Sequence, residues 1–120
     1  MTRKIAIIGS GYMGGGIAQV MALAGAEVHI ADVSYEVTQH NRERLLNEAA
    51  DFAADGLFPK DAVKRIDARV TVAQDIERAV SNADFVEEAV PEKIDIKHET
   101  LKRISAAASK QAIIASNTST

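Results

Sequence analysis

The sequence predicts an α/β fold in which helices cover both faces of a parallel sheet, and two observations predict it. Short apolar runs alternate with longer amphipathic segments, as in strands joined by crossover helices. The first apolar run also leads into Gly9, Gly11 and Gly14, spaced Gly-x-Gly-x-x-Gly before a helical segment. Because such crossovers are right-handed, the expected strand order is 3-2-1-4-5.

The glycine stretch follows a strand expected at residues 5–8 and is suited to a pyrophosphate. Gly9 allows a tight turn, and Gly11 has no side chain to keep a phosphate away from the backbone. Gly14 lets the following helix pack closely on the strand. The start of that helix offers free N–H groups and a partial positive charge, and both favour an anion.

A second strand, expected at residues 26–31, ends in an acid. Asp32 lies 18 residues after Gly14, and in dinucleotide-binding folds an acid about 20 residues on bonds the adenosine ribose hydroxyls. A carboxylate there repels a 2′-phosphate, and Val33 and Ser34 supply no basic replacement. The pattern therefore predicts a Rossmann-type doubly wound sheet that binds NAD rather than NADP.

The first two helical segments differ in character. A helix at about 14–24 is expected to bury a stripe made by Ile17, Val20, Met21 and Ala24, and its small residues let it lie close to the sheet. A long helix capped by Ser34 is expected to reach about residue 54, followed by a short helix at about 60–66.

This helix pair exceeds what a minimal crossover needs, so we interpret it as an excursion beside the sheet. Its charged residues are expected to solvate an outer face; examples are Arg42, Glu43 and Arg44.

The rest of the chain continues the alternation. A helix after Pro91 is expected to turn Ile94, Leu101 and Ile104 inward. The remaining elements are expected as strands at 70–72, 84–90 and 112–115, with a helix at 75–80. The glycine loop, the turn after the fourth strand and the segment from Ser116 then meet at the carboxyl edge of the sheet.

Composition sets further bounds on function. The 120 residues make one domain with enough chain for a core, and a net charge of −3 argues against nucleic acid as a main partner. The absence of cysteine excludes disulfides, thiol nucleophiles and cysteine metal sites. No apolar stretch is long enough to span a bilayer. We therefore expect a cytoplasmic protein with no metal and no membrane partner.

Four stretches together resemble the NAD-binding domain of the 3-hydroxyacyl-CoA dehydrogenase family. They are IAIIGSGYMGGGIAQ, Asp32 after the second strand, VEEAVPEKIDIK after the fourth, and ASNTST after the fifth. Many dehydrogenases share the first stretch, whereas the last two together are much more specific to this family. The resemblance covers nearly the whole chain. It implies an NAD-dependent oxidoreductase of fatty acid metabolism that interconverts 3-hydroxyacyl-CoA and 3-oxoacyl-CoA.

The resemblance also implies roles for individual residues. The cofactor would contact three groups of residues. These are the pyrophosphate loop, in which Tyr12 and Met13 lie alongside the glycines; the acid that bonds the ribose; and a group near the nicotinamide. Ser119 matches the active-site serine that bonds the reacting oxygen of the substrate. The implied cofactor-binding residues are Gly9, Gly11, Tyr12, Met13, Gly14, Asp32, Glu88, Ala89, Glu92, Lys97 and Asn117.

The resemblance implies that residues 1–120 correspond to the N-terminal domain of that family. The resemblance implies that a catalytic histidine, its partner glutamate and an all-helical domain that closes over the acyl-CoA and forms a homodimer lie downstream. His29, His40 and His98 are expected to be structural. The chain alone is therefore expected to bind NAD(H) without turnover. Two alternatives stay open: another hydroxyacid dehydrogenase of the 6-phosphogluconate-like kind, and a non-catalytic NAD-sensing module.

Overall fold

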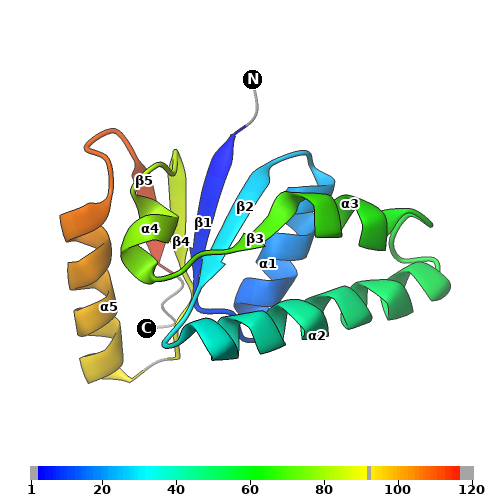
Figure 1. Cartoon of the computed structure of the whole chain (residues 1–120), viewed down its shortest axis with the longest axis horizontal. Helices are drawn as coiled ribbons and strands as arrows, with labels where there is room; N and C mark the ends of the chain where they lie inside the picture. Colours follow the sequence, from blue (N-terminus) through cyan, green and yellow to red (C-terminus); the bar gives the residue numbers. More distant parts are fainter. Residues whose placement is uncertain (1–2, 92, 117–120) are drawn as a thin grey trace.

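The computed structural model describes residues 3–91 and 93–116, which form a five-stranded parallel sheet in the order β3-β2-β1-β4-β5 (Figure 1). The predicted fold class and strand order are confirmed. In chain order the elements are β1 (Lys4–Ile8), α1 (Tyr12–Leu23), β2 (Glu27–Ala31), α2 (Tyr35–Ala54), α3 (Ala62–Arg69), β3 (Val70–Val72), α4 (Ile76–Val80), β4 (Phe85–Glu88), α5 (Ile94–Ala107) and β5 (Ile113–Ser116).

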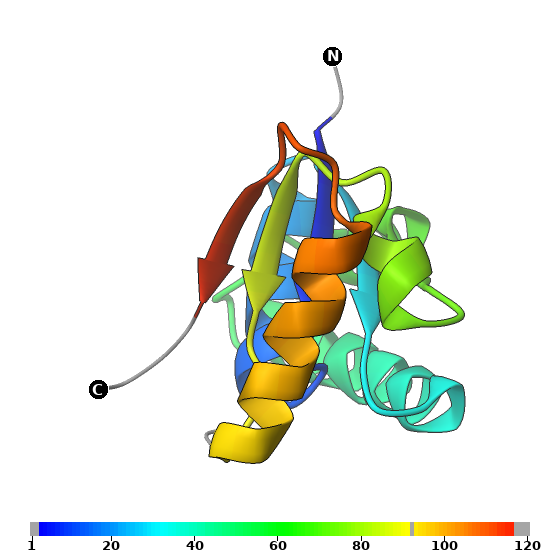
Figure 2. The same ribbon diagram turned by 90° about the vertical axis from the view of Figure 1, so that its left-hand side faces the viewer.

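Both faces of the sheet are covered, because side chains along β1 alternate between two buried clusters. Ile5 and Ile7 pack in the cluster under α1, α2 and α3. Ala6 and Ile8 pack in the other cluster, under α4 and α5. In Figure 2, α4 and α5 lie in front of the strands and α1 lies behind them. A strand buried on both faces reads as a continuous apolar run, which explains the sequence of β1.

Helix α1 packs through its smallest residues rather than through the predicted stripe. Its buried residues are Gly14, Gly15, Ala18, Gln19 and Ala22. Val20 and Ala24 are exposed, so their predicted burial is wrong, while Ile17 and Met21 are half-buried. The expectation that small residues bring the helix close to the sheet is confirmed.

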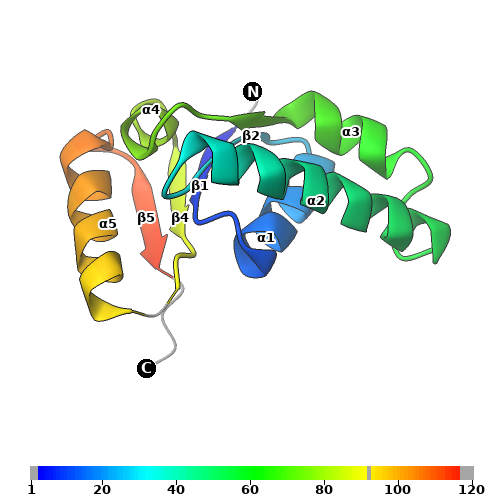
Figure 3. The ribbon, with the colours of Figure 1, turned by 60° about the horizontal axis from the view of Figure 1, so that its bottom comes forward.

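Helices α2 and α3 form the predicted excursion and lie side by side, extending beyond the sheet (Figure 3). The predicted cap is confirmed, because the Ser34 hydroxyl oxygen accepts a hydrogen bond of 3.1 Å from the Val37 N–H. At the far end the rings of Phe52 and Phe58 pack edge to face, with centroids 5.2 Å apart. Nearer the sheet, α2 and α3 both contact α1, so the excursion is anchored to the rest of the fold at that end.

Helix α5 buries Lys97, Thr100 and Ile104 against the sheet. Ile94 is 73% exposed, so its predicted inward position is wrong, whereas Leu101 is half-buried and Ile104 fully buried. Within the described residues, no helix is both long and apolar enough to cross a membrane.

Candidate functional site

The carboxyl ends of the parallel strands bring four segments to one edge of the sheet. The glycine loop follows β1, Asp32 follows β2, Ala89 follows β4, and Ser116 ends β5. Backbone hydrogen bonds tie these ends together: Gly9 N–H donates to the Ala31 carbonyl at 2.8 Å, and Ala89 N–H donates to the Ile8 carbonyl at 2.7 Å. The predicted meeting of the loop with the end of β4 is therefore confirmed.

The three motif glycines face different surroundings. Gly9 has φ +103°, and a Cβ placed on it would lie 2.6 Å from the Ala89 carbonyl oxygen. A Cβ on Gly14 would overlap the Gly9 carbonyl oxygen. A Cβ on Gly11 would meet nothing within 4 Å. Gly9 and Gly14 are thus required by the fold, whereas the space at Gly11 is open to a ligand.

Helix α1 begins at this open space. Gly11 is its N-cap residue and supplies no capping side chain, and no acidic residue lies in the first turn. Tyr12 is 75% exposed and Met13 is also exposed. The first N–H groups of a helix lack intrahelical partners and carry partial positive charge. This helix start is therefore suited to an anion such as a pyrophosphate.

Asp32 lies beside the loop and is half-buried. Its Oδ2 accepts hydrogen bonds from the N–H and the hydroxyl of Ser10, both at 2.6 Å. Its Oδ1 accepts one from the Val33 N–H at 2.7 Å. A carboxylate oxygen accepts more than one hydrogen bond, so Oδ1 retains capacity for a ribose hydroxyl. The acid and the glycine loop are therefore joined directly at the carboxyl edge of the sheet.

Two arginines of α2 correct the expectation that this helix merely presents solvated charges. Arg42 donates to the Val70 carbonyl at 2.9 Å and to the Asp67 carboxylate at 2.8 Å. Arg44 donates to the Ser10 carbonyl at 2.9 Å, and its guanidinium carbon lies 4.1 Å from the centroid of the Tyr12 ring. The excursion therefore contacts the glycine loop directly, which sequence patterning did not indicate.

At the β4–β5 end the acid is buried. Glu88 is 0% exposed. Its Oε2 accepts from the Val90 N–H at 2.8 Å, its Oε1 accepts from the Ser116 hydroxyl at 2.6 Å, and the ammonium nitrogen of buried Lys97 lies 3.5 Å from Oε1. A buried charge is tolerated only when it is paired and hydrogen-bonded. Glu88 therefore joins β4, α5 and β5, and we call these contacts the Glu88 network.

Two acids outside these contacts, Glu87 and Glu77, have shifted pKa values. Burial raises the pKa of Glu87, and the neighbouring charge of Glu88 raises it further. Between α4 and α5, the hydrogen bonds from Arg103, at 2.7 and 2.8 Å, lower the pKa of Glu77 to about 2. Neither acid was singled out by its sequence context, because both shifts depend on tertiary neighbours.

A groove of about 370 Å³ lies beyond Asp32, where the chain after β2 approaches α4 and α5. Its apolar lining comes from Val33, Ile76 and Ile96, and its polar lining from Asp95, Glu99, Thr100 and Arg103. An apolar lining with a few polar groups beside it is typical of sites that take a heteroaromatic ring.

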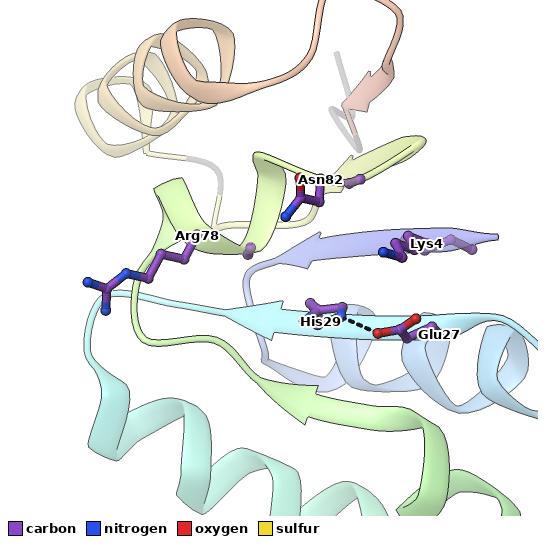
Figure 4. Close-up of a pocket in the computed structure, with 8 residues that line it drawn as sticks. Lys4, Glu27, His29, Arg78 and Asn82 are labelled. Atoms are coloured by element: carbon purple, nitrogen blue, oxygen red, sulfur yellow. Dashed lines mark hydrogen bonds and ion pairs between the residues drawn. The ribbon is translucent and has the colours of Figure 1, made fainter. Parts of the chain in front are cut away.

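A smaller cavity of about 90 Å³ lies against α4 and includes Lys4 and Glu27, the first residues of β1 and β2. It is therefore at the opposite edge of the sheet from the glycine loop. In Figure 4 the His29 ring faces the Glu27 carboxylate, with Nε2 and Oε1 3.0 Å apart, while Arg78 points away from both. This position accords with a structural role for His29.

Three predicted site residues, Glu92, Asn117 and Ser119, lie outside the described residues. His40 and His98 are exposed on α2 and α5. Among the residues that the structure describes, no group of three or more His, Cys, Asp or Glu side chains could hold a metal ion.

Comparison with known proteins agrees with this geometry. Residues 4–120 match the family model described as 3-hydroxyacyl-CoA dehydrogenase, NAD binding domain. The chain is 39% identical over 116 residues to an L-carnitine dehydrogenase/betainyl-CoA thioesterase of Agrobacterium fabrum, covering 97% of the chain and 23% of that protein. It is 36% identical over 117 residues to a probable 3-hydroxybutyryl-CoA dehydrogenase of Bacillus subtilis, covering 98% of the chain and 40% of that protein.

Among solved structures, the chain is similar to the (S)-3-hydroxybutyryl-CoA dehydrogenase from Ralstonia eutropha. The TM-score is 0.88 at 29% identity, over 99% of this chain and 42% of that one. The chain thus spans less than half the length of each of these relatives. On the family match over residues 4–120, the chain belongs to the 3-hydroxyacyl-CoA dehydrogenase family and corresponds to its NAD-binding domain.

Proposed function

We propose that this chain binds NAD(H) at the carboxyl edge of its sheet and is the cofactor-binding part of an oxidoreductase. The reaction would interconvert 3-hydroxyacyl-CoA and 3-oxoacyl-CoA by hydride transfer. The observation that carries the proposal is the open space at Gly11, which lies at the uncapped start of α1 and close to Asp32. A pyrophosphate fits there because Gly11 has no side chain to exclude it and the N–H groups of the helix start would face it.

The adenosine half follows from this placement. Asp32 would bond the ribose hydroxyls through Oδ1, and the adenine would enter the groove lined by Val33, Ile76 and Ile96. The pyrophosphate would rest on the loop formed by Gly9, Gly11, Tyr12, Met13 and Gly14. A carboxylate at this position disfavours the 2′-phosphate of NADP.

The nicotinamide half would lie toward β4 and β5. We place it near Ala89. Glu88 and Lys97 would support that region without contacting the ring, because Glu88 is fully buried and already hydrogen-bonded. By family resemblance, Glu92 and Asn117 would also contact the cofactor.

The chemistry is a hydride transfer coupled to a proton transfer. NAD⁺, when bound, supplies the hydride acceptor for the substrate C3–H. The C3 hydroxyl loses its proton to a base, and the C–O bond becomes a carbonyl. Ser119 would hold the reacting oxygen, and the family resemblance assigns the base to a histidine downstream of this chain. The chain itself would contribute cofactor binding and orientation.

Several relatives are named L-carnitine dehydrogenase. A 3-hydroxy acid without CoA is therefore a second candidate substrate. It would undergo the same oxidation at C3, and the two candidates differ in the group attached to the carboxyl carbon and in the charge of the chain beyond C3. An assay of the protein containing this domain with 3-hydroxybutyryl-CoA and with L-carnitine separates them.

The proposal also covers the whole protein. We place the NAD-binding domain at residues 1–120, followed by an all-helical domain that closes over the acyl-CoA and forms a homodimer. We further propose a cytoplasmic protein of fatty acid metabolism without nucleic-acid or membrane partners. The negative net charge of this domain and its lack of cysteine support that setting.

Titration of the chain with NADH and NADPH tests the proposal directly. We expect saturable NADH binding, weaker NADPH binding, and a loss of NADH affinity of about tenfold or more in Asp32→Ala. We expect no reduction of acetoacetyl-CoA by the chain alone. An Asp32→Ala variant that binds NADH like the wild type would contradict the proposed ribose contact, and turnover at ordinary enzyme rates would contradict the assignment of the base.

A further inference from the structure

The glycine loop has no basic side chain of its own between Gly9 and Gly16. The structure brings one to it from α2, a helix that belongs to the excursion rather than to the loop. The Arg44 Nη2 donates to the Ser10 carbonyl at 2.9 Å, and the Arg44 side chain is only 23% exposed. A positive group is thus fixed next to the loop on which the proposed function rests the pyrophosphate.

Ser10 connects this arginine to the ribose acid. Its N–H and hydroxyl both donate to Asp32 Oδ2 at 2.6 Å, and its hydroxyl oxygen accepts from Asn41 Nδ2 at 2.9 Å. Asn41 and Arg44 are three residues apart and therefore share one face of α2. That face holds both the hydroxyl and the carbonyl of Ser10, so the loop conformation and the Asp32 orientation depend on α2.

Tyr12 provides the second contact. It is the first residue of α1 and is 75% exposed, yet the Arg44 guanidinium lies over its ring at 4.1 Å. A cation at this distance from an aromatic face is attracted by the ring quadrupole. The stack therefore restrains an otherwise exposed ring at the mouth of the anion-binding helix start. The Arg44 Nε lies 3.9 Å from the Glu48 carboxylate, which helps to orient the guanidinium.

We propose that Arg44 is a positioning residue for the dinucleotide, acting through Ser10 and Tyr12, and that its charge adds to the attraction of α1 for the pyrophosphate. This inference rests on the proposed function. The excursion would then contribute to cofactor affinity, in addition to the contributions of the glycine motif and of Asp32.

The chain offers a matched control. Arg42 lies on the same helix and donates three hydrogen bonds, but to Val70 and Asp67 rather than to the loop. Arg44→Met and Arg42→Met should both lower the free energy of unfolding. Only Arg44→Met should weaken NADH binding, by about tenfold, and Arg44→Lys should recover part of the loss because it keeps the charge without the planar fork.

Tyr12 provides a readout that a purely structural role for Arg44 would not move. The chain has no tryptophan and two tyrosines, so a Tyr35→Phe background leaves Tyr12 as the single fluorophore. NADH bound at the loop should quench Tyr12 emission by energy transfer. In that background Arg44→Met should shift the quenching midpoint to higher NADH concentration. Because Tyr12 is exposed, Tyr12→Leu should fold normally and weaken binding severalfold, and Tyr12→Phe should recover most of that loss.

Equal NADH affinity in wild type and Arg44→Met, measured on folded protein, would overturn the inference while leaving the proposed function standing. Equal weakening by Arg42→Met and Arg44→Met would also overturn it, because the effect would then follow helix stability. A wild-type chain that fails to bind NADH would overturn both proposals.

Discussion

Two acids lie at the carboxyl edge of the sheet, on either side of β1, and their surroundings differ. Asp32 follows β2, is half-buried, and lies beside the open space at Gly11. Glu88 ends β4, is completely buried, and has both oxygens engaged by the Glu88 network. Position at a strand end therefore does not define a role. Burial distinguishes a carboxylate able to meet a ligand from one that holds three elements together.

Removing the buried acid should have the largest effect. Glu88→Ala removes the carboxylate beside the buried Lys97 ammonium and the acceptor of the hydrogen bonds from the Val90 N–H and the Ser116 hydroxyl. We therefore expect a loss of about 3–5 kcal/mol in the free energy of unfolding. Asp32→Ala should cost about 1–2 kcal/mol. Urea denaturation of both variants measures the difference. Similar losses in the two variants would contradict the distinction between the two acids.

Substitutions at two glycines should likewise distinguish an effect on stability from an effect on NADH binding. Gly14→Ala places a methyl group against the Gly9 backbone and should destabilise the chain by about 2–3 kcal/mol. Gly11→Ala meets no protein atom and should cost at most about 1 kcal/mol, because alanine is a poorer N-cap residue than glycine, yet lower NADH affinity by about tenfold. Thermal melting and NADH titration give the two quantities. Unchanged affinity in Gly11→Ala would place the pyrophosphate elsewhere.

The smallest effect is expected for the Glu77–Arg103 ion pair, which joins α4 to α5 and contacts neither Asp32 nor Glu88. The folded-state pKa of Glu77 is lowered to about 2, so its contribution to stability is present above its ordinary pKa and is lost as pH falls from about 5 toward 2. Both side chains are more than a third exposed, which limits the contribution to about 0.5–1 kcal/mol. Wild type should therefore exceed Glu77→Gln in stability at pH 7, and salt should shrink the gap. A gap as large at pH 2 as at pH 7 would contradict the assignment.

The sequence was sufficient for the parts of the fold that depend on local pattern. The glycine spacing, the position of Asp32 and the Ser34 cap are short-range features, and each takes the predicted place. The strand order followed from general rules of chain connection.

The features that sequence could not provide are those set by distant neighbours. The predicted burial of Val20 and Ala24 on α1 is wrong because the closest approach to the sheet is made by glycine and alanine at other positions of the helix. The contacts of Arg44 join residues 34 positions apart, and those of Glu88 with Ser116 join residues 28 apart. Periodicity within one helix carries no information about such partners.

The two halves of α2 make different contacts, and this has a practical consequence. Its first half carries Asn41 and Arg44, whereas Phe52 in its last turn packs against Phe58. The hairpin tip between α2 and α3, where Gly56 adopts φ +79° and Leu57 is exposed, lies at the far end from the loop contacts. Loop tips of this kind accept added chain readily. A fluorescent label or an affinity tag grafted at this tip would report on the domain without entering its nucleotide chemistry.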